Sequence, residues 1–259
     1  MKNEILSVVF RVENPAKLAQ WYEKIIGTTV RSLQERVWEC HFKKGAKIKL
    51  IKANGSLPYK SDKSSVYWKI GLTMPNVDLA REKISNNSVT VSNPSQFLDI
   101  GYMCHLNDAE GFAIELLQWT FEKNLAPFPP IQDQVLGQNP LMGQITLRSS
   151  KIDESLGFYR DILGMKLLSK QKVETYGFTL YFLAFTDEEP PIADLESVEN
   201  RQWLWQRQFT TIELQYKPGA KIVPLQDLNP GLDCIEIRSS KLKEEILIDP
   251  DGVKIKVIN

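Results

Sequence analysis

Two short motifs of the sequence carry opposite charges at the same position. The segments DAEGFAIELLQ (108–118) and DPDGVKIKVIN (249–259) each predict a tight turn closed by a glycine, followed by a strand with alternating faces. Four residues after the glycine, the first strand carries Glu115 and the second carries Lys256. A carboxylate can bind a cation or move a proton, whereas an ammonium does not hold a divalent cation. One structural unit therefore occurs twice, with different chemistry in each copy.

The two histidines also occupy matching places. His41 and His105 each follow a cysteine on a predicted strand, in WECHFKKGAKIKLI (38–51) and YMCHLNDAEGFAIELL (102–117). A pair of histidines is a candidate for metal binding. Equivalent positions in repeated strands also match for packing reasons, and we predict a structural placement for both.

Composition and charge narrow the class of protein. The 259 residues, 42% hydrophobic and 25% charged, predict a globular chain with a full core. The 32 basic and 32 acidic residues balance, which gives no broad attraction to nucleic acid or to an anionic membrane. We expect neither a signal peptide nor a membrane span. The three cysteines are far apart and form no CxxC pair, which predicts reduced thiols in a cytoplasmic protein.

The chain contains a long internal repeat. The segment SVVFRVENPAKLAQWYEKIIGTTV (7–30) matches QITLRSSKIDESLGFYRDILGMKL (144–167) without a gap. The offset is constant at 137 positions (148 minus 11) for the pairs Arg11 and Arg148, Tyr22 and Tyr159, and Gly27 and Gly164. Such self-similarity predicts that one supersecondary unit is used more than once.

The repeated segment predicts a strand that leads into a helix. Asn14 and Asp153 are placed to cap the two helices, and Pro15 suits a first helical position. Gly27 and Gly164 follow the last helical residues, where a left-handed conformation is wanted. We therefore expect the same strand and helix at the start of both halves.

The chain is interpreted as four units, each a strand, a helix and three strands. The units are 5–53, 65–118, 142–216 and a shortened fourth one, 230–259, for which we predict three strands and no helix. They form two modules, 1–120 and 141–259, joined by a stiff proline-rich connection at 121–140. The irregular stretch 187–202 predicts a surface loop. We expect the aromatic residues Phe178, Trp203 and Trp205 to lie in the hydrophobic core.

These repeats resemble the vicinal oxygen chelate superfamily, which includes glyoxalase I (lactoylglutathione lyase), extradiol dioxygenases and bleomycin-resistance proteins. The segments QITLRSSKIDESLGFYRDILGM, FTLYFLAFTDEEPP and RQFTTIELQY look like glyoxalase I. The resemblance implies an α+β fold in which two modules of βαβββ repeats form curled mixed sheets around a cleft. It also implies a small-molecule ligand and a monomer or homodimer.

The resemblance implies a site shared by units two and three. Gln144, Glu213 and Glu115 match family positions that bind a divalent metal, zinc or nickel. The two glutamates would also be catalytic, with Glu115 as the base. Arg148 matches the arginine that the family uses on a glutathione carboxylate, and Lys217 and Lys69 would also contact the substrate. The implied function is a lyase or isomerase acting on the thiol hemithioacetal of a small aldehyde.

Lys69 stands where glyoxalase I has a histidine ligand. Strand alternation places Tyr67, Lys69 and Gly71 on one side, so Lys69 should face the cup. Two close carboxylates need a cation between them. Either a metal or the Lys69 ammonium could be that cation, and the second choice favours a metal-free binding protein. An extradiol dioxygenase would need two histidines in slots where neither is found.

Units one and four supply a second set of residues at the corresponding positions. These are Ser7, Lys49, Cys234 and Lys256. Two lysines without a carboxylate do not hold a divalent cation. We therefore expect that the second site has lost its chemistry.

Overall fold

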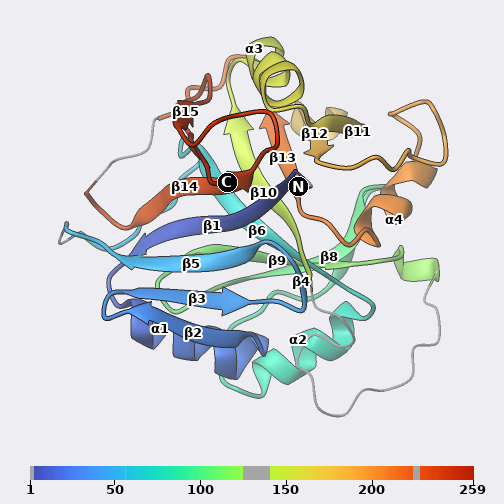
Figure 1. Cartoon of the computed structure of the whole chain (residues 1–259). Helices are drawn as coiled ribbons and strands as arrows, with labels where there is room; N and C mark the ends of the chain where they lie inside the picture. Colours follow the sequence, from blue (N-terminus) through green and yellow to red (C-terminus); the bar gives the residue numbers. More distant parts are fainter. Residues whose placement is uncertain (1–2, 56, 125–140, 224–227) are drawn as a thin grey trace.

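The computed structural model describes residues 3–55, 57–124, 141–223 and 228–259. It consists mostly of strands with few helices, so the α+β class is confirmed (Figure 1). The predicted connection 121–140 lies largely outside the described residues. The helices are α1 (Pro15–Trp21), α2 (Val77–Ser85), α3 (Ile152–Gly157) and α4 (Glu199–Trp205), with π-helical turns at Tyr22–Ile26 and Phe158–Ile162 and short 3₁₀ turns at Glu122–Asn124 and Glu174–Tyr176.

The strands follow the order that the repeats predict. Units one and two contain β1 (Glu4–Val12), β2 (Thr29–Gln34), β3 (Val37–His41), β4 (Lys44–Gly45), β5 (Lys47–Lys52), β6 (Tyr67–Met74), β7 (Ser95–Phe97), β8 (Gly101–Asn107) and β9 (Ala113–Gln118). Units three and four contain β10 (Leu141–Ser149), β11 (Lys166–Val173), β12 (Phe178–Ala184), β13 (Thr211–Tyr216), β14 (Gly231–Arg238), β15 (Ile246–Ile248) and β16 (Lys254–Val257). Residues 231–257, all of them described, form three strands and no helix, as predicted.

Two sheets combine these units across the chain. The first has the order β15-β16-β14-β1-β5-β3-β2 and joins units one and four. The second has the order β11-β12-β13-β10-β6-β9-β8-β7, with β4 also pairing β10, and joins units two and three. Each sheet therefore takes strands from both sides of the 121–140 connection. The division into modules 1–120 and 141–259 stays a prediction.

Both sheets contain a β-bulge at an equivalent place. In the second sheet Lys69 pairs with Thr146 and Tyr67 pairs with Leu147, which leaves Trp68 as the extra residue of β6. In the first sheet the extra residue of β14 is Asp233, because its neighbours pair with successive residues of β1. A bulge re-aims side chains relative to strict alternation. Trp68 consequently lies beside Lys69 on the concave face, and the predicted placement of Tyr67 on that face is wrong.

The helix termini confirm most of the predicted capping residues. The Oδ1 atom of Asn14 accepts a hydrogen bond of 3.0 Å from the backbone N–H of Lys17. Gly27 and Gly164 adopt φ angles of 82° and 80°, in the left-handed region that favours glycine. The prediction for Asp153 is wrong, because α3 begins at Ile152 with Lys151 at its N-cap, and Asp153 lies in the first turn. There its charge still suits the positive end of the helix.

The helical segments of units one and three are each tied to a distant turn. The Tyr22 hydroxyl donates to Asp108 at 2.9 Å, and the Tyr159 hydroxyl donates to Asp249 at the same distance. All four side chains are buried. The acidic turns quoted from the sequence therefore anchor the helix of the preceding unit.

The stretch 187–202 is only partly the surface loop that the sequence predicts. Its last residues begin α4, which packs against β11. The Trp205 indole on this helix donates to the backbone carbonyl of Ile100 at 3.1 Å. Trp205, Phe182 and Leu117 belong to a small hydrophobic cluster on the concave side of the second sheet. The insertion thus closes one side of that sheet with aromatic residues.

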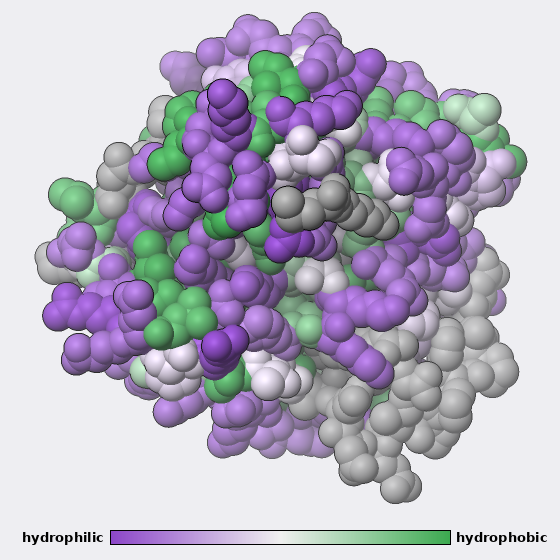
Figure 2. Space-filling model, viewed as in Figure 1, coloured by the Kyte–Doolittle hydropathy of each residue, from purple (hydrophilic) through white to green (hydrophobic). Residues whose placement is uncertain are grey.

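The main core lies between the two sheets. Phe10 of β1 packs against Tyr67 of β6 and against Phe112, with ring centroids 5.2 and 4.7 Å apart. On the face seen in Figure 2, hydrophilic side chains predominate and hydrophobic ones lie in separate groups. None of the described helices is both long enough and apolar enough to cross a membrane.

Candidate functional site

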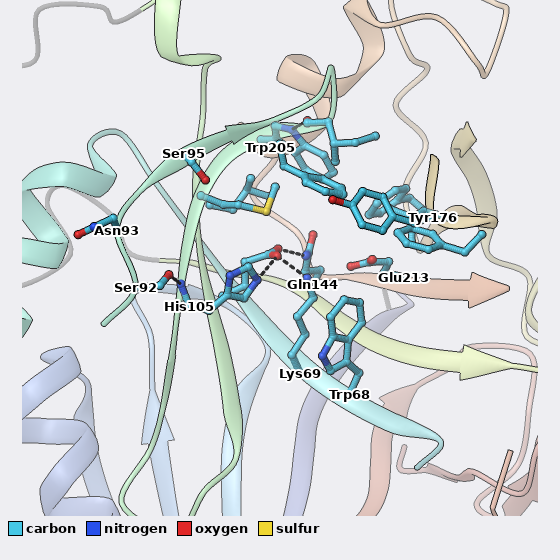
Figure 3. Close-up of a pocket in the computed structure, with 18 residues that line it drawn as sticks. Trp68, Lys69, Ser92, Asn93, Ser95, His105, Gln144, Tyr176, Trp205 and Glu213 are labelled. Atoms are coloured by element: carbon cyan, nitrogen blue, oxygen red, sulfur yellow. Dashed lines mark hydrogen bonds and ion pairs between the residues drawn. The ribbon is translucent and has the colours of Figure 1, made fainter. Parts of the chain in front are cut away.

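Four predicted site residues lie on the four central strands of the second sheet. Glu213 is on β13, Gln144 on β10, Lys69 on β6 and Glu115 on β9, which are neighbours in that order. All four side chains are buried and line one cavity (Figure 3). Because strands of a sheet lie about 4.8 Å apart, residues on one face of adjacent strands come within contact distance.

Glu115 is the centre of the polar contacts in this cavity. Its Oε2 atom accepts a hydrogen bond from the Lys69 ammonium and, at 3.0 Å, interacts with His105 Nε2. Its Oε1 atom accepts a hydrogen bond of 2.7 Å from Gln144 Nε2. Burial alone would raise the pKa of Glu115, but Lys69 and His105 outweigh this effect and lower the pKa to about 2. Glu115 is therefore ionised and held on both oxygens.

Glu213 has a different environment in the same cavity. Its described hydrogen bond comes from the Thr146 hydroxyl, at 2.7 Å from Oε2. Burial raises the pKa of Glu213 and the charge of Glu115 adds to the rise, while Lys69 and Thr146 oppose it. Two carboxylates whose pKa values move in opposite directions suit different roles. Glu213 therefore binds a proton more readily than Glu115, whose pKa is lowered.

His105 lines the cavity, a position that the sequence interpretation did not predict. Its side chain is 47% exposed and reaches Glu115. The register of β8 with β9 sets His105 directly opposite Glu115. Directly opposite residues of an antiparallel pair share a face. The glycine-closed turn before Glu115 could have revealed this pairing, because residues 105 and 115 are equally far from its middle.

Gly71 makes room for Gln144. A Cβ atom on Gly71 would lie 2.3 Å from the Gln144 Cγ atom, far closer than two carbon atoms can approach. The Oε1 atom of Gln144 is buried and has no hydrogen-bond partner among the described residues. A buried acceptor without a donor is costly unless a ligand or water supplies one. It is therefore a natural contact for a donor group of a bound molecule.

The cavity above these residues, here called the acidic pocket, has a volume of about 330 Å³. Most of its remaining lining is apolar and aromatic. These residues are Trp68, Phe97, Ile100, Met103, Leu117, Tyr176, Phe178, Leu180, Phe182 and Trp205. Phe178 and Trp205, for which the sequence predicts core, thus line the pocket, while Trp203 packs at the edge of the same cluster. A pocket with an apolar wall and a few convergent polar groups is typical of a small-molecule site.

A second cavity of about 370 Å³ adjoins the first, and we call it the basic pocket. It shares the three aromatic residues Trp68, Tyr176 and Phe178 with the acidic pocket. Arg148 and Lys217, the predicted substrate contacts, both line it, as does Lys63. No carboxylate is among its described lining residues. The two pockets together can hold a ligand with one polar reacting end and one anionic end.

The donor set does not fit a divalent metal in this arrangement. Among residues 3–55, 57–124, 141–223 and 228–259, no group of three or more His, Cys, Asp or Glu side chains is placed to hold a metal ion. The Lys69 ammonium occupies one oxygen of Glu115, and Gln144 points its amide nitrogen rather than its oxygen at the other. A metal at Gln144, Glu213 and Glu115 stays a prediction that requires Lys69 to leave.

The equivalent place in the first sheet contains a carboxylate that the sequence interpretation missed. Glu236 is buried, accepts a hydrogen bond from Ser7 and pairs with Lys49 at 2.9 Å. Lys256 is more distant, at 3.9 Å, and Cys234 is buried without a role in this ion pair. Glu236 stands opposite Ser7 as Gly71 stands opposite Gln144. In the second sheet the long polar side chain of this pair is Gln144 on β10, whereas in the first sheet it is Glu236 on the partner strand β14.

Comparisons with known proteins agree with this fold. No protein-family model matches the chain. Lactoylglutathione lyase from Oryza sativa subsp. japonica is 25% identical over 179 residues, which cover 59% of this chain and 50% of that protein. Lactoylglutathione lyase from Haemophilus influenzae is 41% identical over 54 residues, 21% of this chain and 39% of that protein. The chain therefore spans half or less of these curated relatives.

The solved structure of glyoxalase I from Zea mays superposes over nearly the whole chain. The TM-score is 0.67 at 19% identity, covering 99% of this chain and 92% of that one. Curled mixed sheets with a cup on the concave face define a protein of the glyoxalase fold. The chain is therefore similar in fold to glyoxalase I and similar in sequence to two lactoylglutathione lyases.

Proposed function

We propose that the protein is a glyoxalase I-like lyase or isomerase, and that its substrate is the hemithioacetal of a thiol and a small aldehyde. The observation that carries this proposal is the pair of adjoining pockets. The acidic pocket ends in the groups needed for proton transfer, and the basic pocket ends in Arg148 and Lys217. A glutathione adduct has both features, a reacting carbon at one end and carboxylates at the other.

The reaction needs a base that is buried and not already neutralised. Glu213 meets this need, since its pKa is raised by burial and by Glu115. In the proposed step Glu213 removes the proton from the carbon that bears the hydroxyl and the sulfur. The electron pair forms a carbon–carbon double bond with the neighbouring carbonyl carbon, whose oxygen becomes negative. The hydroxyl proton passes to the negative oxygen, and protonated Glu213 returns its own proton to the neighbouring carbon. The former hydroxyl oxygen becomes the carbonyl oxygen of the thioester, and the product is the thioester of a hydroxy acid.

The remaining polar groups stabilise the negative oxygen and orient the substrate. Lys69 supplies a positive charge in a buried site, where electrostatic stabilisation is strongest. Glu115 holds Lys69 and Gln144 in place through its two oxygens. The unpartnered Oε1 atom of Gln144 accepts the substrate hydroxyl. In this scheme Lys69 carries out the role for which the resemblance implies a metal.

The second candidate is a metal-free binding protein with the same ligand class. The observation that favours it is that both oxygens of Glu115 are satisfied within the protein. An ion pair whose groups are already satisfied within the protein does not need to react with a bound molecule. If the protein is a binding protein, we expect it to bind the hemithioacetal without converting it.

Turnover of the hemithioacetal of glutathione and methylglyoxal tests the proposal. Thioester formation would be followed by ultraviolet absorbance for the wild type, for Glu213→Gln and for the control Glu236→Gln, which changes the equivalent cup of the first sheet. We expect turnover in the wild type and in the control, and a loss of at least about 100-fold in Glu213→Gln, as for removal of a general base. Binding without turnover in all three would select the second candidate. Neither binding nor turnover would contradict both.

A further inference from the structure

The two sheets place an arginine at equivalent positions but give it different partners. Arg11 on β1 and Arg148 on β10 match in the sequence repeat. Each lies next to the bulge of the partner strand, where the extra residue is Asp233 in the first sheet and Trp68 in the second. The chain therefore contains its own comparison of an arginine beside a carboxylate with an arginine beside an indole.

In the first sheet the arginine is neutralised. The guanidinium of Arg11 forms an ion pair with Asp233 and is 6% exposed. It also donates to the backbone carbonyls of Asn229, at 3.0 Å, and Leu232, at 3.1 Å. A buried guanidinium with a carboxylate and two carbonyls has little capacity left for a ligand.

In the second sheet the arginine has no direct carboxylate partner among the described residues. The charge of Asp62 acts on it from a distance, while the Asp62 carboxylate itself accepts hydrogen bonds from Ser64 and Ser65. Arg148 donates to the backbone carbonyls of Ser65, at 2.8 Å, and Asp62, at 3.2 Å, and forms no ion pair among the described residues. Its guanidinium lies over the Trp68 ring, 5.0 Å from the ring centroid. A stacked indole orients a guanidinium without cancelling its charge. Arg148 lines the basic pocket.

Trp68 also belongs to the acidic pocket. The Lys69 ammonium lies 4.2 Å from the same ring centroid. Figure 3 shows Trp68 beside Lys69, below the aromatic wall that includes Tyr176. Because Trp68 lines both pockets, a ligand that spans them passes along its ring.

We infer that Trp68 is a specificity-determining residue, which keeps the charge of Arg148 available for a carboxylate of a ligand that spans both pockets. This inference rests on the proposed function for the identity of that ligand, a carboxylate-bearing thiol adduct. Asp233 at the equivalent bulge of the first sheet removes the same capacity from Arg11.

The substitution Trp68→Asp tests the inference, because it places at this bulge the residue type that occurs at the equivalent bulge of the first sheet. Calorimetry would compare the binding of S-hexylglutathione with that of its diethyl ester. We expect the wild type and Trp68→Phe to prefer the acid by at least about tenfold, as charge-assisted hydrogen bonds predict. Trp68→Asp and Arg148→Met should lose most of this preference, since only Lys63 and Lys217 would then remain as available cations among the described lining residues of the basic pocket. A preserved preference in Trp68→Asp would overturn the inference.

Two controls isolate the effect of the new carboxylate on Arg148. Trp68→Asp is also measured in a Lys69→Met background, where the carboxylate has no ammonium to neutralise. If it acts on Arg148, most of the preference for the acid is lost in both backgrounds, whereas a loss that requires Lys69 overturns the inference. Melting temperatures and circular dichroism check that each variant folds.

A separate measurement distinguishes failure of the inference from failure of the proposed function. If the wild type binds neither glutathione derivative, the proposed ligand is contradicted. Mass spectrometry would then follow the modification of Arg148 by butanedione, with glutarate as a simple dicarboxylate. Protection by glutarate in the wild type and in Trp68→Phe, but not in Trp68→Asp, supports the role of Trp68. Equal protection in all three overturns it.

Discussion

The ammonium of Lys69 donates a hydrogen bond to the Oε2 atom of Glu115, and both side chains are almost completely buried. Gln144 and His105 complete the contacts of the same carboxylate. The negative charge of Glu115 is therefore balanced by the chain itself. This ion pair has consequences for stability, for titration and for metal affinity.

The substitution Glu115→Gln should destabilise the protein by about 3–5 kcal/mol, because it leaves the buried Lys69 ammonium without a counter-charge. Urea denaturation measures the free energy of unfolding. The double variant Glu115→Gln, Lys69→Met should recover much of this loss, because it removes the uncompensated charge. A double variant as unstable as the single one would show that the ion pair is not the cause.

His105→Gln should raise the pKa of Glu115 from its value of about 2, because His105 is one of the groups that lower it. Carbon-13 NMR of the glutamate carboxyl groups follows this titration. His41→Gln is the matched control, since His41 contacts Glu39 in the first sheet at 2.9 Å. An unchanged titration of Glu115 in His105→Gln would contradict the contact.

The free energy of unfolding should fall as the pH rises, because of the titration of Asp249. Burial raises the pKa of Asp249 from 3.8 to about 6, against the opposing hydrogen bonds from Val253 and Tyr159. The folded state therefore binds the proton more tightly than the unfolded state. Its stabilising contribution is fully present below about pH 3.8 and is lost as the pH rises through about 6.

Asp249→Asn tests this pH dependence. Urea denaturation between about pH 4 and pH 7 should show a shallower decline of stability in the variant than in the wild type. Glu196→Gln is a surface control that should not make the decline shallower, because Lys170 and Lys172 lower the pKa of Glu196, the opposite direction to Asp249. The same slope in Asp249→Asn and in the wild type would rule out Asp249 as its source.

Gly71→Ala should displace Gln144 and lower turnover by about tenfold or more, because the new methyl group and Gln144 Cγ cannot share the space. The comparison is Gly157→Ala at the end of α3, where the nearest atom is 3.8 Å from the added Cβ. That variant should keep full activity and gain up to about 1 kcal/mol of stability. Equal activity in the two variants would mean that Gln144 does not need its present position.

The fold was largely predictable because its signals are local and repeated. Alternating strands, capped helices and the glycines at Gly27 and Gly164 occur at one offset, so each copy supports the other. The positions of Glu115 and Gln144 followed from the same motifs. The α4 helix was less predictable, because its polar, proline-bearing approach resembles a loop and its packing comes from tertiary contacts.

The details that failed depend on strand pairing rather than on sequence periodicity. A bulge at Trp68 cannot be seen by counting alternate residues, since it exists only relative to β10. Glu236 was missed because its importance comes from facing Ser7 on another strand, far away in sequence. His105 was recoverable from the hairpin register, but its matching place in a repeated strand favoured a structural interpretation.

Metal content tests most directly whether Lys69 takes the place of a metal. The protein would be purified without a histidine tag, soaked in nickel or zinc, desalted and analysed by plasma mass spectrometry. The wild type should retain no metal, whereas Lys69→His should retain close to one ion per chain and lose it when Glu115→Gln is added. Close to one ion per wild-type chain, lost in a Glu115→Gln, Glu213→Gln variant, would contradict the account.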